Sequence, residues 1–162
     1  MNADRAPQLK AIVRLLHFNA KMNPVSDARF WKLYYGVAAC SWMPHWACHY
    51  YRLETNSDFV VGSWAFSQAD SIVSLIVYSL LVTLNLLAIQ ANGFRIIAAV
   101  LTGLGHLALG SLHAYRLFYP FTFTVFGYSW SYGASLREVL IVIPFGLLSL
   151  AVAIIAGRNE RG

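Results

Sequence analysis

Histidine and arginine recur in this sequence at one fixed spacing within apolar surroundings. The element His49-Tyr-Tyr-Arg52 returns later in the chain as His113-Ala-Tyr-Arg116. Neutral imidazole is a good ligand for haem iron, and arginine one helical turn away suits a carboxylate. We therefore predict that His49 and His113 are opposing axial ligands of haem b or another tetrapyrrole. The other predicted cofactor contacts are Arg52 and Arg116, beside the propionates, with Tyr51 and Tyr115.

A structural explanation accounts for the same repeat. In that case His49 and His113 form hydrogen bonds across a helix bundle, just inside an interfacial belt of tyrosine and arginine. The two arginines would then contact phospholipid phosphates. Duplication copies structural residues as faithfully as functional ones, so the sequence leaves both alternatives open.

Two further histidines extend the set toward a metal site. His45 precedes His49 by four residues and His106 precedes His113 by seven, so each pair shares one helix face. Imidazole suits iron, copper or zinc. The candidate metal ligands are His45, His49, His106 and His113. No carboxylate lies within either of these helices, and Glu138 is expected near the start of a later helix, where capping is its simplest use.

Nucleophilic catalysis finds little support in the sequence. Cys48 adjoins His49, but neighbouring side chains project about 100° apart around a helix. The chain has no Gly-x-Ser-x-Gly element, no phosphate-binding loop and no dinucleotide fingerprint. The sequence therefore favours a chain without catalytic activity of its own, and a membrane enzyme stays open as an alternative.

Four apolar stretches each have roughly the 20 residues that cross a bilayer. They cover residues 30–53, 72–90, 96–118 and 139–157. The chain is 58% hydrophobic and 12% charged over 162 residues, which is too apolar for a soluble domain of this size. The predicted fold class is an all-α integral membrane protein, a four-transmembrane-helix bundle.

The bundle is expected over residues 30–157 as two tandem helix-loop-helix repeats, at about 30–90 and 96–157. At the offset that aligns His49 with His113, seven of nineteen positions from His49/His113 to Ser67/Ser131 are identical. Because each repeat contains two spans, both enter the membrane in the same orientation. The pseudo-twofold axis should therefore run along the membrane normal.

The segments outside the bundle set its orientation. Residues 1–29 contain a basic amphipathic helix at about 8–21, which would lie on the membrane surface or dock a cytoplasmic partner. Residues 158–162 form a short tail. Nine of the twelve Lys and Arg residues fall on the side of the termini and three on the other. The positive-inside rule therefore predicts that both termini are cytoplasmic. The default location for such a multi-pass protein is a prokaryotic plasma membrane.

The two outer loops share a pattern of aromatic residues around a glycine. Residues 59–66 and 121–130 both predict short β-hairpins. Each loop then reaches a predicted helix cap, Ser67 to Asp70 in the first repeat and Ser135 to Glu138 in the second.

These features predict a small subunit of a membrane redox or energy-transducing complex, which carries a tetrapyrrole or packs against partner subunits. The alternative is a small transporter or membrane enzyme that acts on a lipid-like substrate near the outer leaflet. The expected partners are the lipid bilayer and either other membrane subunits or a second copy of the chain. The net charge of +5 is not accompanied by a nucleic-acid-binding motif.

Overall fold

The computed structural model describes residues 28–125 and 128–159, and within them it contains four long helices. These are α2 (Ala28–Thr55), α3 (Gln68–Gln90), α4 (Arg95–Phe118) and α5 (Tyr132–Asn159), with a short 3-10 helix η1 (Asn92–Phe94) between α3 and α4. All four predicted apolar stretches lie inside these helices, which confirms the four-helix architecture. The predicted amphipathic helix at about 8–21 lies outside the described residues.

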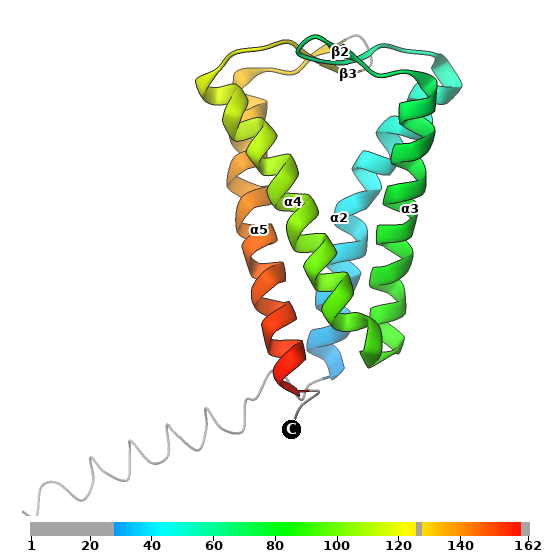
Figure 1. The fold of residues 1–162 in the computed structure, drawn as a ribbon, viewed down its shortest axis with the longest axis vertical. Coiled ribbons are helices and arrows are strands. Elements are labelled where there is room, and N and C mark those ends of the chain that lie inside the picture. The colour runs from blue at the N-terminus through cyan, green and yellow to red at the C-terminus, as the bar shows by residue number, and fades with distance from the viewer. Residues whose placement is uncertain (1–27, 126–127, 160–162) are drawn as a thin grey trace, which may run out of the picture.

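The helices form two antiparallel pairs, one from each repeat. Helix α2 packs along α3, and α4 packs along α5. The two pairs spread apart toward the end that carries the strands and meet at the opposite end, where α2 begins and α5 finishes (Figure 1). The space between the pairs is therefore widest directly beneath the strands.

The hydrophobic core lies at the narrow end of the bundle. It takes residues from all four helices, namely Trp31, Tyr34, Tyr35, Ala38, Ala88, Ala98, Ala99, Val152, Ala153 and Ala156. Large rings of α2 pack against small residues of the other helices, so the backbones approach closely. The Tyr35 hydroxyl also donates a 2.6 Å hydrogen bond to the Arg95 carbonyl. These contacts join the two repeats at their base.

Three helical segments are long and apolar enough to cross a membrane, Gln68–Gln90, Asn92–Phe118 and Tyr132–Arg158. This composition indicates a membrane protein. Helix α2 is not among them, although it has 28 residues. Its apolar residues alternate with Lys32, Arg52 and two histidines, which lowers its mean hydropathy.

A four-stranded antiparallel sheet covers the wide end. Strands β1 (Phe59–Val61), β2 (Trp64–Ala65), β3 (Phe123–Val125) and β4 (Tyr128–Ser129) lie in the order β2-β1-β3-β4. Both predicted hairpins are confirmed, and the sheet also joins them through β1 and β3. Val60 pairs with Thr124, and each of these positions is the repeat equivalent of the other. The pseudo-twofold axis therefore passes between Val60 and Thr124.

The turn and cap predicted for the first repeat are confirmed. Gly62, in the turn between β1 and β2, has a φ of +63°, a left-handed conformation that glycine adopts without strain. The Ser67 hydroxyl accepts a 3.2 Å hydrogen bond from the Asp70 amide. The Asp70 carboxylate in turn accepts a 2.7 Å bond from the Ser67 amide. This reciprocal capping box fixes the start of α3.

The cap predicted for the second repeat is wrong. Helix α5 starts at Tyr132, and the Ser131 hydroxyl accepts a 3.1 Å hydrogen bond from the Ala134 amide. Ser131 is the repeat equivalent of the α3 cap, so both repeats use the same position. Ser135 and Glu138 therefore lie inside α5, where they do not cap it.

Candidate functional site

A cavity of about 770 Å³ lies between the two helix pairs beneath the sheet. Apolar side chains of the helices and of strands β1 and β3 make up most of its wall. The polar side chains that line it are Ser41, His45, Cys48, His49, Ser74, Tyr78, His106, His113 and Glu138. A mostly apolar pocket of this volume with a few polar groups is typical of a small-molecule site.

His49 and His113 take equivalent places on opposite sides of the cavity. The Nδ1 atom of each lies 3.3 Å from a serine hydroxyl, that of Ser71 for His49 and that of Ser135 for His113. Each ring also packs on a phenylalanine of its own repeat's hairpin, His49 on Phe59 and His113 on Phe123, with ring centroids 5.1 and 5.2 Å apart. Because Nδ1 is engaged, Nε2 is the nitrogen left for a ligand. It can bind a metal when Nδ1 carries the proton.

Arg52 and Arg116 bind the ends of the outer loops to the helices. Each guanidinium donates to two consecutive carbonyl oxygens and to the serine that contacts the histidine. The acceptors are Phe66, Ser67 (3.2 Å) and Ser71 Oγ (3.1 Å) for Arg52, and Trp130, Ser131 (3.2 Å) and Ser135 Oγ (2.7 Å) for Arg116. Both side chains are buried. The arginines therefore hold each loop to its own repeat, a role that the sequence interpretation did not include.

The tyrosines of the repeated element lie elsewhere. Tyr51 and Tyr115 are 51% and 57% exposed and do not line the cavity. Tyr115 stacks on Tyr119 with ring centroids 4.7 Å apart. Of the predicted cofactor contacts, the structure thus brings the two histidines to the cavity, and the tyrosines lie on the outer surface.

His45 and His106 line the cavity without equivalents in the other repeat. The His45 ring stacks on Tyr78 with centroids 5.6 Å apart. His106 Nδ1 donates a 2.8 Å hydrogen bond to the Thr102 carbonyl, because a carbonyl oxygen can only accept. In the neutral ring Nε2 is then the acceptor. The repeat position of His106 is occupied in α2 by Trp42, and these two rings touch across the pseudo-twofold axis with centroids 4.1 Å apart.

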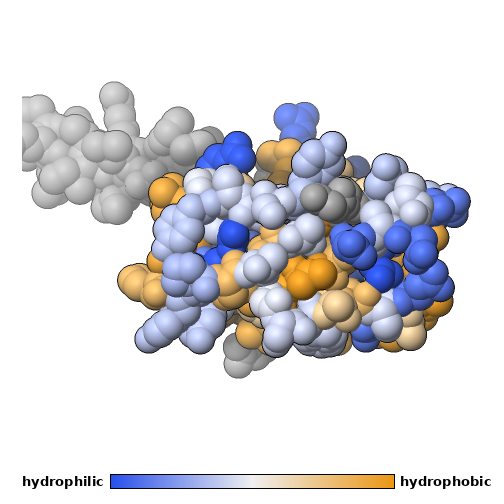
Figure 2. Space-filling view, turned by 90° about the horizontal axis from the view of Figure 1, so that it is seen from above, coloured by the Kyte–Doolittle hydropathy of each residue, from blue (hydrophilic) through white to orange (hydrophobic). Residues whose placement is uncertain are grey.

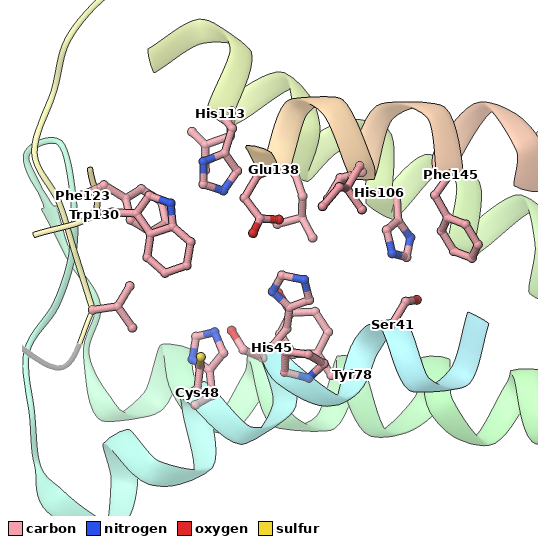
Figure 3. Close-up of a pocket in the computed structure, with 18 of the residues that line it drawn as sticks. Ser41, His45, Cys48, Tyr78, His106, His113, Phe123, Trp130, Glu138 and Phe145 are labelled. Atoms are coloured by element: carbon pink, nitrogen blue, oxygen red, sulfur yellow. The ribbon is translucent and has the colours of Figure 1, made fainter. Parts of the chain in front are cut away.

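Glu138 is the cavity residue that sequence reasoning assigned wrongly. It lies two turns inside α5, and Figure 3 shows Glu138 and His113 extending into the cavity from one side and His45 and Tyr78 from the other. The correct start of α5 would have revealed this position. The contacts of Ser71 and Ser135 with the histidines and arginines were also not predicted. The two serines are repeat equivalents, four residues beyond Ser67 and Ser131.

All four histidines line the cavity, but they do not gather at one point. Over residues 28–125 and 128–159, no three His, Cys, Asp or Glu side chains lie close enough together to hold a metal ion. The predicted metal site thus has no preformed ligand cluster, and it stays a prediction. Its proposed ligands are His45, His49, His106 and His113. A macrocycle needs only two axial ligands.

The arrangement can bind and exchange protons with a ligand that is mainly apolar. Neutral imidazole offers one donor and one acceptor, and the Glu138 carboxyl and the Tyr78 hydroxyl add to this set. Apolar walls exclude water, which strengthens each hydrogen bond made inside. Comparison of the chain with protein-family models, curated proteins and solved structures finds no match.

Proposed function

We propose that this chain is a four-span integral membrane protein that binds a lipid-soluble ligand with a polar end in the cavity beneath its outer sheet. The observation that carries this proposal is the cavity itself, with apolar walls and a polar group of histidines and Glu138 on its sides. A transporter or membrane enzyme for a lipid-like substrate was the alternative function predicted from the sequence. We keep its class of ligand and propose binding without a reaction.

Several features support the membrane placement of all four helices. Helix α2 lies antiparallel to α3, so a membrane that contains α3 would contain α2 as well (Figure 1). The outward side chains of α3 and α5 include Leu80, Ile141 and Ile154, each at least 60% exposed. The sheet end is different, since Figure 2 shows hydrophilic and intermediate residues over most of that face. The excess of Lys and Arg near the termini supports a cytoplasmic position for the opposite end.

The cavity wall has an apolar part and a hydrogen-bonding part, and together they indicate the class of ligand. Leu109, Leu112, Val142 and Phe145 offer only apolar contacts, whereas Glu138 and the histidines offer hydrogen bonds. Burying a ligand's polar group against the apolar wall alone would be unfavourable, because no partner would replace its water. A molecule with an apolar body and one hydrogen-bonding end satisfies both parts.

We expect a bound lipid-like compound to co-purify with the protein. The protein would be isolated in lipid nanodiscs, extracted with organic solvent and analysed by mass spectrometry. Loss of a ligand hydrogen bond in Glu138→Ala should weaken retention about tenfold, for a bond worth about 1.4 kcal/mol. Glu54→Ala, an exposed carboxylate outside the cavity, is the control and should retain the compound. Extracts that contain only bulk membrane lipids in bulk proportions would contradict the proposal.

A second candidate is the tetrapyrrole-binding subunit of a redox complex. The observation that favours it is the matched pair of cavity histidines, His49 and His113, each with Nδ1 held by a serine. Hydrogen bonds of this kind orient the ring of a metal ligand. The arginines could then bind propionates only through N–H groups that do not already donate to the loop carbonyls.

The second candidate predicts a coloured protein. Its absorption spectrum should contain a Soret band, with α and β bands that sharpen on reduction by dithionite. His49→Ala and His113→Ala should each abolish these bands, because a bis-histidine site needs both ligands. His106→Ala should keep them. A spectrum without visible bands would exclude the tetrapyrrole and leave the lipid-like ligand.

A further inference from the structure

The cavity wall is exposed to the surroundings along one seam. Five residues that line the cavity are also exposed on the outside of the bundle, namely Val37, Pro44, Ile141, Pro144 and Leu148. All of them belong to α2 or α5. Every described lining residue from α3, α4 and the strands is buried or only partly exposed. The cavity therefore opens sideways between α2 and α5.

The seam related to this one by the pseudo-twofold axis, between α3 and α4, contains the side chain of Trp42. Trp42 is 1% exposed and stacks on Tyr78 with ring centroids 5.8 Å apart. A Cβ atom added to Gly105 would lie only 2.6 Å from the Trp42 ring. The indole Nε1 lies 3.5 Å from the Thr102 hydroxyl, which accepts its hydrogen bond. Trp42 therefore closes this side.

At the same repeat position, the second repeat has a smaller side chain. His106 replaces the indole with an imidazole, and its Nδ1 is bound to the carbonyl of its own helix. Its ring meets Phe145 edge-on with centroids 5.0 Å apart. The seam between α2 and α5 thus lacks the large ring that fills the other seam.

Both helices beside the opening contain an internal proline. Pro44 lies in α2 and Pro144 in α5. They are not repeat equivalents, because the matching positions are Ala108 and Leu80. Each proline lacks the amide hydrogen of one helical hydrogen bond, which weakens its helix at that point. Two prolines on the one open seam are consistent with helices that part there.

We propose that the gap between α2 and α5 is a lateral portal through which a lipid-soluble ligand passes from the bilayer into the cavity. This inference rests on the proposed function for the class of ligand. The rim residues Val37, Ile141 and Leu148 are apolar and 48%, 66% and 52% exposed, which suits contact with acyl chains. The sheet covers the cavity on its outer side. A ligand that enters sideways would meet Glu138 and His45 with its polar end.

Glu138 provides a reporter for this route that needs no knowledge of the natural ligand. Dicyclohexylcarbodiimide dissolves in lipid and adds to a protonated carboxyl group, and the adduct rearranges to a stable N-acylurea that keeps every atom of the reagent. Peptide mass spectrometry of the protein in nanodiscs would measure the initial rate of modification at Glu138. Glu138→Gln removes the reacting carboxyl and serves as the blank.

The repeat supplies matched variants for the portal. Ile141→Trp and Val37→Trp place an indole on the rim. Val77→Trp and Leu101→Trp make the corresponding change at the equivalent exposed positions of the closed seam, which do not line the cavity. We expect the rim variants to slow modification of Glu138 about tenfold and the closed-seam variants to leave the rate near that of the original protein. Gel filtration and thermal melting would show that all four variants remain folded.

Three results would overturn the portal. The first is equal slowing by rim and closed-seam variants, and the second is no modification of Glu138 in the original protein. The third is modification by a charged, water-soluble carbodiimide as fast as by the lipid-soluble one, which would place the opening in water. The protein could also contain no bound compound and still show modification of Glu138 that the rim variants slow. That result would support the portal and contradict only the proposed ligand-binding function.

Discussion

Arg116→Ala is expected to destabilise the protein by on the order of 3–5 kcal/mol, because several hydrogen bonds from a charged donor are lost at once. The guanidinium donates to the carbonyls of Phe121, Trp130 and Ser131 and to the Ser135 hydroxyl. Its side chain is 8% exposed, so water would not readily replace it. Thermal melting of the protein in detergent or nanodiscs measures the loss.

The other arginines of the outer side provide graded controls. Arg52 makes the same bonds except the one from Nε, which is buried without a partner, whereas Arg116 Nε donates to Phe121. Arg52→Ala should therefore cost about 1 kcal/mol less than Arg116→Ala. Arg137 is exposed, and its replacement should cost less than about 0.5 kcal/mol. Arg116→Lys should not restore stability, because lysine lacks the planar fork that reaches several acceptors.

This series also separates the alternative roles of the arginines. If Arg52 and Arg116 serve mainly to bind propionates or phospholipid phosphates, their replacement by alanine should leave the melting temperature of the ligand-free protein unchanged. If they hold the loops, both variants should melt at lower temperature with or without any bound molecule. A melting temperature for Arg116→Ala equal to that of Arg137→Ala would refute the structural role derived from the hydrogen bonds.

The sequence predicted the parts of the fold whose causes are local. Apolar stretches of span length identified the four helices, and glycine between aromatic residues identified both hairpins. The pairing of β1 with β3 was not predicted, since it joins segments from different repeats and neither hairpin sequence alone requires it. The start of α5 was misplaced because Ser131 and Ser135 are both suitable caps, and only comparison with Ser67 distinguishes them.

Most residues that the sequence predicted for the candidate site are identical in the two repeats. Residues that match between the repeats, such as His49/His113 and Arg52/Arg116, drew attention because they match. In the structure the matched arginines and serines build the scaffold of each repeat. The cavity gains its asymmetry at positions that differ, where Ser74 corresponds to Glu138 and Trp42 to His106. Residues that are identical in the two repeats thus identify the scaffold, and residues that differ between them identify the polar groups that make the cavity asymmetric.

The contact between α4 and α5 gives the second large expected effect. Gly103 faces Gly146, and a Cβ atom on Gly103 would lie 3.0 Å from the Gly146 carbonyl oxygen and 2.8 Å from Leu150 Cδ2. Small residues on a membrane helix allow a neighbouring helix to approach closely. In the structure that neighbour is α5, which carries Glu138 on the cavity wall.

We expect Gly103→Leu to destabilise the protein by about 3 kcal/mol, since a leucine there must push two backbones apart. Gly36→Leu is the matched control, because a Cβ atom on Gly36 would meet nothing within 4 Å. There the change should be neutral or stabilising by up to about 1 kcal/mol, because glycine is a poor residue for a helix interior. Thermal melting of both variants tests the pair. Equal melting temperatures would mean that α4 and α5 are not packed as closely as Gly103 and Gly146 require, and the position of Glu138 would then need to be determined anew.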